Sequence, residues 1–471
     1  MKNNSGGGLL KKTGIYAIGT FGSKLLTFLL VPVYSFYLNK ESFGTYDLVI
    51  TTINLLVPFV TLQISDSVFR WLITSKDQQE RNNAIYGGIL VSIIGIIVIS
   101  VISLLTYLIH PLKGHFWITV LSILSIVYPF LQQVTRGLGF SKVYAFNGVI
   151  YTLIFLVFNI LFLIVFELGL NSLYFSAIIA YGISCVLILR KIHLASYLKR
   201  KTIDRVLIRE MIKYSFPLVP NTISWWLINS ANKYLILMIL GIQENGIFAM
   251  SNRFPVILVM INQVFTLAWQ ESAITDYDEE KSNSHGKVLE NLIKVQFAIV
   301  VMLSLASELI VKNFLSSEYL ESWYYMPILF LSAAFLSLSS FYGALYLGAK
   351  KTKDIFTTTI FSGILNIVLG YLLISKFGLF GVAFSTFIGY FFLFINRAYL
   401  VQKNRISVFK FPLKTFIIYS ILIVITLVIV YKIGGLVSII SIPISILILG
   451  LLNFKSIINL KNTIIKKQKL N

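Results

Sequence analysis

Apolar residues occur in long runs along almost the whole chain, and short polar segments separate the runs. A helix needs roughly 20 apolar residues to cross the hydrocarbon core of a bilayer. The runs reach this length, so they predict about 14 membrane-spanning helices in an all-α polytopic membrane protein. The predicted spans lie near 13–38, 43–66, 85–109, 116–136, 143–167, 171–189, 214–240, 246–271, 288–313, 324–348, 355–376, 378–400, 415–433 and 435–453.

The number of spans depends most on two tight turns. Lys376-Phe377-Gly378 separates 355–376 from 378–400, and Lys432-Ile433-Gly434-Gly435 separates the last two spans.

With an even number of spans, both termini lie on one side. Lysine and arginine gather in alternate connections, above all in the stretch 190–213 and the tail 455–469. Basic loops stay in the cytoplasm. We therefore expect a multi-pass membrane protein with both termini cytoplasmic.

Composition supports this class and excludes others. Apolar residues make up 57% of the 471 residues and charged residues 13%, whereas soluble domains have roughly 45–50% and 25%. A set of soluble domains and a disordered chain are both excluded. The net charge of +21 would suggest nucleic acid in a soluble protein. Here the basic residues lie between apolar runs and act as topology signals, so we expect membrane lipids and no nucleic acid as partners.

No enzymatic or metal chemistry is evident in the sequence. The single cysteine, Cys185, lies within an apolar run, and the four histidines lack the spacing of a metal site. The longest predicted external loop, 314–323, is too short for a catalytic domain. We expect a protein that is not an enzyme and needs no cofactor or metal.

Two windows of the sequence resemble each other. In YSFYLNKESFGTYDLVITTINLL, from Tyr34, and YLILMILGIQENGIFAMSNRFPVIL, from Tyr234, a helix ends shortly before Gly-x-aromatic and a new helix follows. The glycines, Gly44 and Gly246, occupy corresponding places after spans one and seven. This pattern predicts two six-helix lobes related by a parallel pseudo-two-fold axis, plus two C-terminal helices, which is a transporter plan. The predicted parts are lobe 1–189, basic cytoplasmic linker 190–213, lobe 214–400, and 401–471 with two spans and a basic tail.

Charged residues at membrane depth are the main candidate site residues, because charge in a bilayer is costly and usually functional. Lys24 lies about eleven residues into the first span, near mid-membrane. Lys233 and Arg253 lie roughly 10 Å below the external surface on neighbouring predicted helices, so one polar seam could hold both. Asp47 is a candidate counter-ion for one of them. The alternative is that each charge pairs with a neighbour only to fix helix packing.

These deep groups are mostly basic, which favours an anionic ligand such as phosphate, diphosphate or carboxylate. Amide and aromatic side chains accompany them, notably Asn232 and Trp226, and such groups hydrogen-bond and stack on sugars. Interface anchoring is the alternative for the tryptophan. Arg70 lies at a predicted cytoplasmic end, either as a headgroup anchor or at the cytoplasmic mouth of a substrate path.

Three stretches carry a resemblance to a known family: KKTGIYAIGTFGSKLLTFLLVPVYSFYLNKESFGTYDLVITT, the following DSVFR, and KYSFPLVPNTISWWLINSANKYLILMILGIQENGIFAMSNRF. They resemble bacterial polysaccharide flippases of the O-antigen and capsule repeat-unit type, in the multidrug/oligosaccharidyl-lipid/polysaccharide exporter superfamily. The family often has Asp-Arg where this chain has Asn232-Lys233. The cation is kept and the carboxylate is absent, which puts a proton- or ion-coupling role at position 232 in doubt.

The resemblance implies a function. The protein would lie in the bacterial cytoplasmic (inner) membrane. It would flip undecaprenyl-diphosphate-linked oligosaccharide from the cytoplasmic to the external leaflet by alternating access, with a polysaccharide polymerase as a further partner. Other classes stay open at this point. They are a flippase for the peptidoglycan lipid precursor, a multidrug/cation antiporter, which would need an embedded carboxylate cluster, and a membrane polysaccharide polymerase, which would need a large external loop.

Overall fold

The computed structural model describes residues 22–109, 115–194, 197, 204–275, 282–349, 351–407 and 409–433, with 440, 442–446 and 450. Within these residues every regular element is a helix. The start of the first predicted span and most of the span 435–453 lie outside the described residues. The all-helical class is therefore confirmed for the described part, while the total of about 14 spans stays a prediction.

Nine helices in the described part are long and apolar enough to cross a membrane. This finding confirms a multi-pass membrane protein. They are α2 (Lys40–Thr61), α4 (Gln78–Ile109), α5 (His115–Gly137), α6 (Ser141–Ile160) with the π-helical turn Leu161–Val165, α7 (Leu170–Ile192), α14 (Ser282–Phe314), α15 (Ser322–Gly348), α16 (Thr352–Lys403), and α17 (Leu413–Val428) with the π-helical turn Ile429–Ile433.

The element α16 contains the predicted turn. Gly378 has φ 55° and ψ −138°, a backbone conformation that only glycine adopts without strain. Gly381 then lies against the preceding arm, where an added Cβ would be 2.6 Å from the carbonyl oxygen of Leu373. The two arms therefore run antiparallel from this point, and the predicted separation at Lys376-Phe377-Gly378 is confirmed.

The second predicted span, near 43–66, corresponds to α2, a helix long and apolar enough to cross a membrane, and the chain breaks shortly before the predicted end. The helix α2 ends at Thr61, and Leu62 and Gln63 both adopt left-handed backbone conformations, with φ 51° and 55°. The chain then continues as α3 (Ile64–Thr74). The side chain of Gln63 donates a hydrogen bond of 2.9 Å to the hydroxyl of Thr222. This contact with α10 (Leu218–Ser230) is a tertiary interaction that hydropathy does not encode.

Two further predicted spans, 214–240 and 246–271, are also divided, so their prediction as continuous helices was wrong. The first consists of α10 and α11 (Asn232–Ile239). The second consists of α12 (Ile242–Ser251) and α13 (Val256–Thr275), with a turn over 252–255 between them. Pro255 ends that turn. Proline lacks the backbone N–H and disfavours helical geometry in the residue before it, which accounts for the break.

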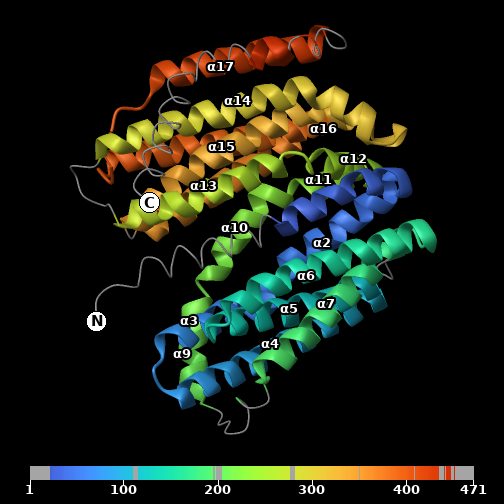
Figure 1. Ribbon diagram of the computed structural model, residues 1–471, viewed down its shortest axis with the longest axis vertical. Helices are drawn as coiled ribbons and strands as arrows, with labels where there is room; N and C mark the ends of the chain where they lie inside the picture. Colours follow the sequence, from blue (N-terminus) through green and yellow to red (C-terminus); the bar gives the residue numbers. More distant parts are fainter. Residues whose placement is uncertain are drawn as a thin grey trace, which may run out of the picture. The chain divides into compact units, whose positions relative to one another are not determined.

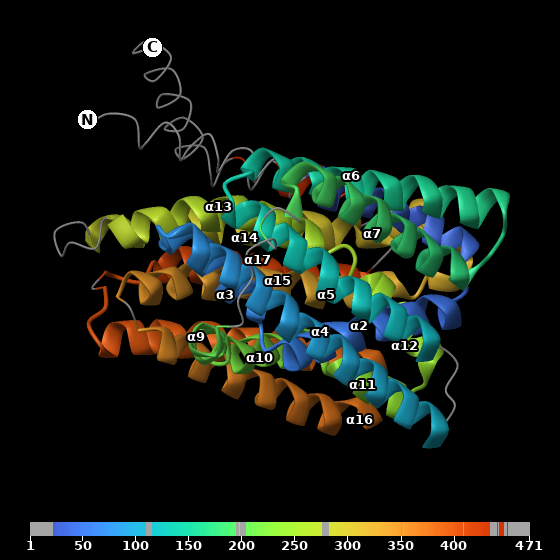
Figure 2. The ribbon, with the colours of Figure 1, turned by 90° about the horizontal axis from the view of Figure 1, so that it is seen from below.

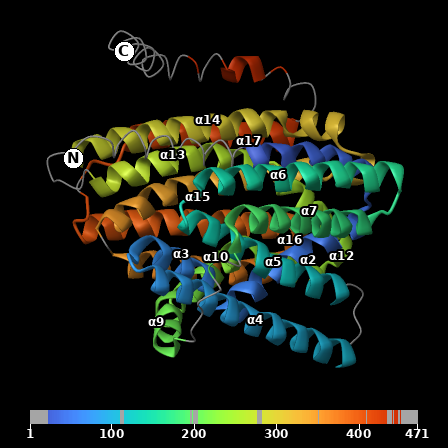
Figure 3. The ribbon, with the colours of Figure 1, turned by 60° about the horizontal axis from the view of Figure 1, so that its bottom comes forward.

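The chain forms two compact units, Met1–Tyr234 and Leu235–Asn471. In the first unit α5, α6 and α7 run side by side (Figure 1). Its core also includes α9 (Arg205–Ser215), which packs on α3 and α4 (Figure 3). Leu207 and Met211 of α9 are buried there. Part of the stretch predicted as a cytoplasmic linker is thus a packed helix, while the predicted lobe boundaries stay a prediction.

In the second unit α15 is the central helix. Its spanning segment is 89% buried, against 44% for α14. Figure 2 shows α13 and α15 running side by side, and both α13 and α14 pack on α15. Phe335 of α15 makes edge-to-face contacts with aromatic side chains from neighbouring helices, including Phe297 and Phe416. Burial on all sides explains why α15 has an apolar sequence without a polar face.

Arg397 is fully buried in this unit, with 1% of its surface exposed. Its guanidinium donates to the carbonyl oxygen of Ser339 at 3.0 Å and to the hydroxyls of Thr359 at 3.0 Å and Thr358 at 3.3 Å. The hydroxyl of Tyr346 donates to the Arg397 carbonyl at 3.2 Å. Arg397 therefore joins both arms of α16 to α15 from within the core.

Replacing Arg397 by methionine should destabilise the protein by about 3 kcal/mol or more, because several charge-assisted bonds to buried acceptors are lost. The measurement is thermal unfolding of the purified chain in detergent. Lys403→Met, at the exposed end of the same element, is the matched control and should change stability by less than about 0.5 kcal/mol. Equal stability of the two variants would contradict the role of Arg397.

Candidate functional site

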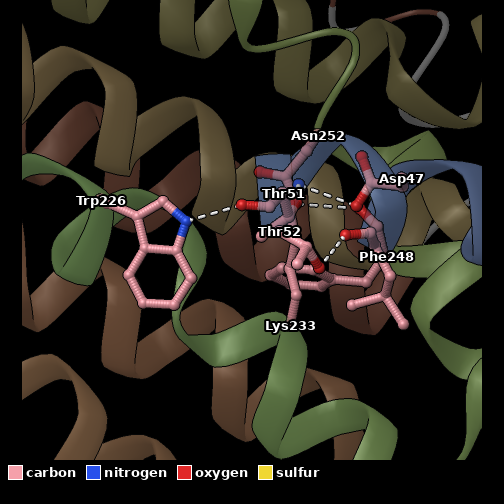
Figure 4. A network of polar contacts seen from close by, with 8 residues as sticks. Asp47, Thr51, Thr52, Trp226, Lys233, Phe248 and Asn252 are labelled. Carbon is pink, nitrogen blue, oxygen red and sulfur yellow. Dashed lines mark hydrogen bonds and ion pairs between the residues drawn. The ribbon is translucent and has the colours of Figure 1, made fainter. Parts of the chain in front are cut away.

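An ion pair between Asp47 and Lys233 is the centre of the candidate site (Figure 4). Asp47 lies on α2 and Lys233 on α11, and the Lys233 Nζ lies 2.8 Å from a carboxylate oxygen of Asp47. The two side chains are 10% and 16% exposed, respectively. The same ammonium also donates to the hydroxyl of Thr51, one turn further along α2, at 3.2 Å. The lysine is thus held by one charged and one neutral acceptor.

Neighbouring contacts fix the position of Lys233 relative to α2. The indole N–H of Trp226 donates to the backbone carbonyl of Thr51 at 3.0 Å, as Figure 4 shows. The hydroxyls of Thr52 and Tyr234 are 2.7 Å apart and hydrogen-bonded. The rings of Trp226 and Tyr234 are 5.8 Å apart between centroids. Side chains on both sides of the α10–α11 break are therefore attached to one stretch of α2.

The expectation that Asp47 is a counter-ion is confirmed for Lys233. This pairing changes the electrostatics predicted from the sequence, because a carboxylate already neutralises the lysine. A buried ion pair avoids the large cost of an uncompensated charge at this depth. The substrate-binding roles of Asp47 and Lys233 stay predictions, and any anionic ligand of Lys233 must contend with the carboxylate already bound to it.

The structure also places three other predicted site residues, Lys24, Asn232 and Arg253. Lys24 is partly buried on the helix formed by residues 22–37, where the neighbouring Ser23 hydroxyl donates to the Gly148 carbonyl of α6 at 3.3 Å. Asn232 is 4% exposed and begins α11. Arg253 belongs to the second unit and lies in the turn between α12 and α13, not on a continuous helix as predicted. A seam shared by Lys233 and Arg253 stays a prediction.

Arg70 is exposed on α3 and contacts aromatic rings. Its guanidinium carbon lies 4.1 Å from the ring centroid of Tyr214 on α9 and 5.8 Å from that of Trp71. A cation over an aromatic face at this distance is favourable. The contact connects α3 to α9. Whether Arg70 also lies at the mouth of a substrate path stays a prediction.

A polar cluster near Arg70 was missed in the sequence analysis. The Gln133 side chain donates to Asp66 at 3.0 Å, and the Arg136 guanidinium lies 4.3 Å from the ring centroid of Phe69. These residues come from α3 and α5. The motif DSVFR contains Asp66 and Arg70 four residues apart, which was the available signal. The described residues contain no group of three or more His, Cys, Asp or Glu that could hold a metal ion.

Comparison with known proteins places the chain in a family. The family described as "Polysaccharide biosynthesis protein" matches residues 9–274, more than half of the chain. The chain belongs to this family. The resemblance inferred from the sequence is thereby confirmed, and the matched region includes both Asp47 and Lys233. A search of curated proteins with this chain found no match.

Solved structures share its fold. The lipid II flippase MurJ in an inward closed conformation matches with a TM-score of 0.69 and 16% identity, over 94% of this chain and 99% of that one. An inward-facing multidrug resistance MATE family transporter of the MOP superfamily matches with a TM-score of 0.66 and 15% identity, over 81% and 94%. An outward-facing MATE family transporter matches with a TM-score of 0.61 and 15% identity, over 86% of this chain and 98% of that one. At these identities the likeness shows the fold alone.

A double-mutant cycle should show that the ion pair of this polysaccharide biosynthesis protein is strongly coupled. Asp47→Asn and Lys233→Gln, alone and combined, are expected to give a coupling free energy of about 1–3 kcal/mol, because both side chains are largely desolvated. Thermal unfolding in detergent measures it. The matched control is the Glu308–Lys312 pair, 2.6 Å apart with a lysine 58% exposed. That pair should give about 0.3–0.5 kcal/mol, and similar values for both pairs would refute the prediction.

Proposed function

We propose that this protein flips undecaprenyl-diphosphate-linked oligosaccharide repeat units from the cytoplasmic to the external leaflet for assembly of a surface polysaccharide such as O-antigen or capsule. The observation that carries the proposal is a largely buried lysine, Lys233, held within the helices of a polysaccharide biosynthesis family member. The shared fold with a flippase and with multidrug transporters supports transport across the membrane.

The diphosphate is the part of this substrate that most needs protein contacts. Moving an uncompensated anion into a low-dielectric interior is prohibitively costly. In the proposed mechanism Lys24, Lys233 and Arg253 supply the compensating charge, and the polyprenyl tail stays in the lipid. The indole N–H of Trp226 is already bonded to Thr51, so Trp226 offers the sugar its ring face, while Asn232 offers an amide.

Transport needs a driving force, and the membrane potential supplies one. A diphosphate carries about two negative charges, and moving each across 100 mV changes the free energy by about 2.3 kcal/mol, or roughly 5 kcal/mol in total. An inside-negative potential therefore favours outward movement. In the proposal, two lobes alternate access in the inner membrane, both termini are cytoplasmic, and a polysaccharide polymerase uses the exported units.

A flippase for the peptidoglycan lipid precursor is a second candidate. The observation that favours it is the fold shared with the lipid II flippase MurJ, which spans nearly the whole of both chains. Such a substrate has the same chemistry at its head, a polyprenyl diphosphate bearing sugar. The two candidates therefore predict the same cationic contacts and differ only in the glycan recognised.

Leaflet location of the lipid-linked oligosaccharide tests the proposal directly. Depleting the protein in its own host should leave repeat units protected from an externally added glycan-cleaving enzyme, because they remain in the inner leaflet. Re-expression should make them accessible again. Normal accessibility after depletion, together with peptidoglycan or drug phenotypes, would favour a sister function instead.

Removing the charge of Lys24 should reduce export without removing the protein from the membrane. Lys24→Gln loses one charge-assisted contact worth about 1.5–3 kcal/mol, which corresponds to a fall of about tenfold or more in export. The same enzyme-accessibility assay measures the rate. Lys376→Gln, at the exposed turn within α16, is the control and should export normally. Normal export by Lys24→Gln would eliminate the role of Lys24.

A further inference from the structure

The ammonium of Lys233 is already occupied. Asp47 contributes a carboxylate oxygen at 2.8 Å and Thr51 a hydroxyl oxygen at 3.2 Å. An ammonium group has three N–H donors and no acceptor, so these two contacts use most of its capacity. Carboxylate and phosphate oxygens are the same kind of partner for it, since both are anionic acceptors of charge-assisted hydrogen bonds.

We propose that Asp47 is a resident competitor for the anion site, and that a diphosphate binds by replacing the Asp47 carboxylate on Lys233. This inference rests on the proposed function, because it concerns the site where the diphosphate would bind. In the unloaded protein the carboxylate compensates the lysine. In the loaded protein a phosphate oxygen takes its place.

The competition between Asp47 and the ligand selects ligands by their charge. Both side chains are largely removed from solvent, so separating them leaves charge uncompensated unless the incoming ligand replaces what is lost. A small monoanion offers no more charge than the carboxylate that it must displace. A diphosphate offers about two charges and several oxygens in a single ligand. Asp47 therefore favours polyanionic headgroups over the abundant monoanions of the cell.

The place of the pair in the chain gives the exchange a second consequence. Lys233 and Tyr234 are the last two residues of the first unit, and Leu235 begins the second. Lys233 is tied to α2 through Asp47 and Thr51, and Tyr234 through Thr52. Replacement of Asp47 by a ligand removes one of these ties, so ligand binding weakens the attachment of α11 to α2.

Binding of inorganic pyrophosphate to the purified full-length chain in detergent tests the inference, with isothermal titration calorimetry as the measurement. Asp47→Asn should bind pyrophosphate about tenfold more tightly than the unmodified protein, because the competitor has lost its charge. Asp47→Glu keeps the competing carboxylate and should bind as the unmodified protein does. Lys233→Gln should lose the binding.

Matched controls separate competition from a structural role. Glu41→Gln removes an exposed carboxylate in the first turn of the same helix and should leave the affinity unchanged. Asp47→Ser also removes the charge. It serves as the second uncharged variant in the binding experiment if Asp47→Asn does not fold. In the unmodified protein, pyrophosphate should also change the carboxylate bands of the infrared difference spectrum, a change absent from the uncharged Asp47 variants.

Unchanged or weaker pyrophosphate binding by the uncharged Asp47 variants would overturn the inference, as would an infrared spectrum without a carboxylate change. The leaflet assay on lipid-linked oligosaccharide is a separate readout. Normal flipping with no gain of affinity in Asp47→Asn would reject the competitor and keep the proposed function. Tighter pyrophosphate binding in a protein that flips no lipid-linked glycan would reject the flippase and keep the competitor.

Discussion

The lack of water in the hydrocarbon core is the constraint on which the rest of this structure depends. Backbone polar groups at that depth must bond within the chain, which explains why the described residues form helices and turns. Charged side chains there must also find partners in the protein. The Asp47–Lys233 pair and the buried Arg397 are two responses to this requirement.

The two responses differ in chemistry and therefore in use. Arg397 donates in fixed directions to a carbonyl on α15 and two hydroxyls on the first arm of α16. Its planar guanidinium suits a permanent clamp, because several directed bonds would have to break together. Lys233 is a compact charge that contacts the Asp47 carboxylate and the Thr51 hydroxyl (Figure 4). A point charge of this kind can change one anion for another with little rearrangement.

Each of the two units contains broken helices. The breaks at Leu62-Gln63 and between α10 and α11 lie in the first unit, and the turn over 252–255 lies in the second. Discontinuous membrane helices are typical of transporter binding sites, where backbone groups face a polar region instead of lipid. In this chain the α10–α11 break places Trp226 and Lys233 on different helical segments that both reach α2. The break between α10 and α11 thus helps polar groups of both segments to reach the same stretch of α2.

The sequence by itself determined the membrane class, most of the described spans, the turn at Gly378 and the family resemblance, because hydropathy, glycine geometry and motifs are local properties. It also singled out Asp47 and Lys233 as charges at depth. Only the tertiary structure decided that these two pair with each other, that α9 packs into a core, and that Arg397 is a buried clamp. Each of these depends on residues far apart in the chain, and local patterns carry no information on which distant side chains meet.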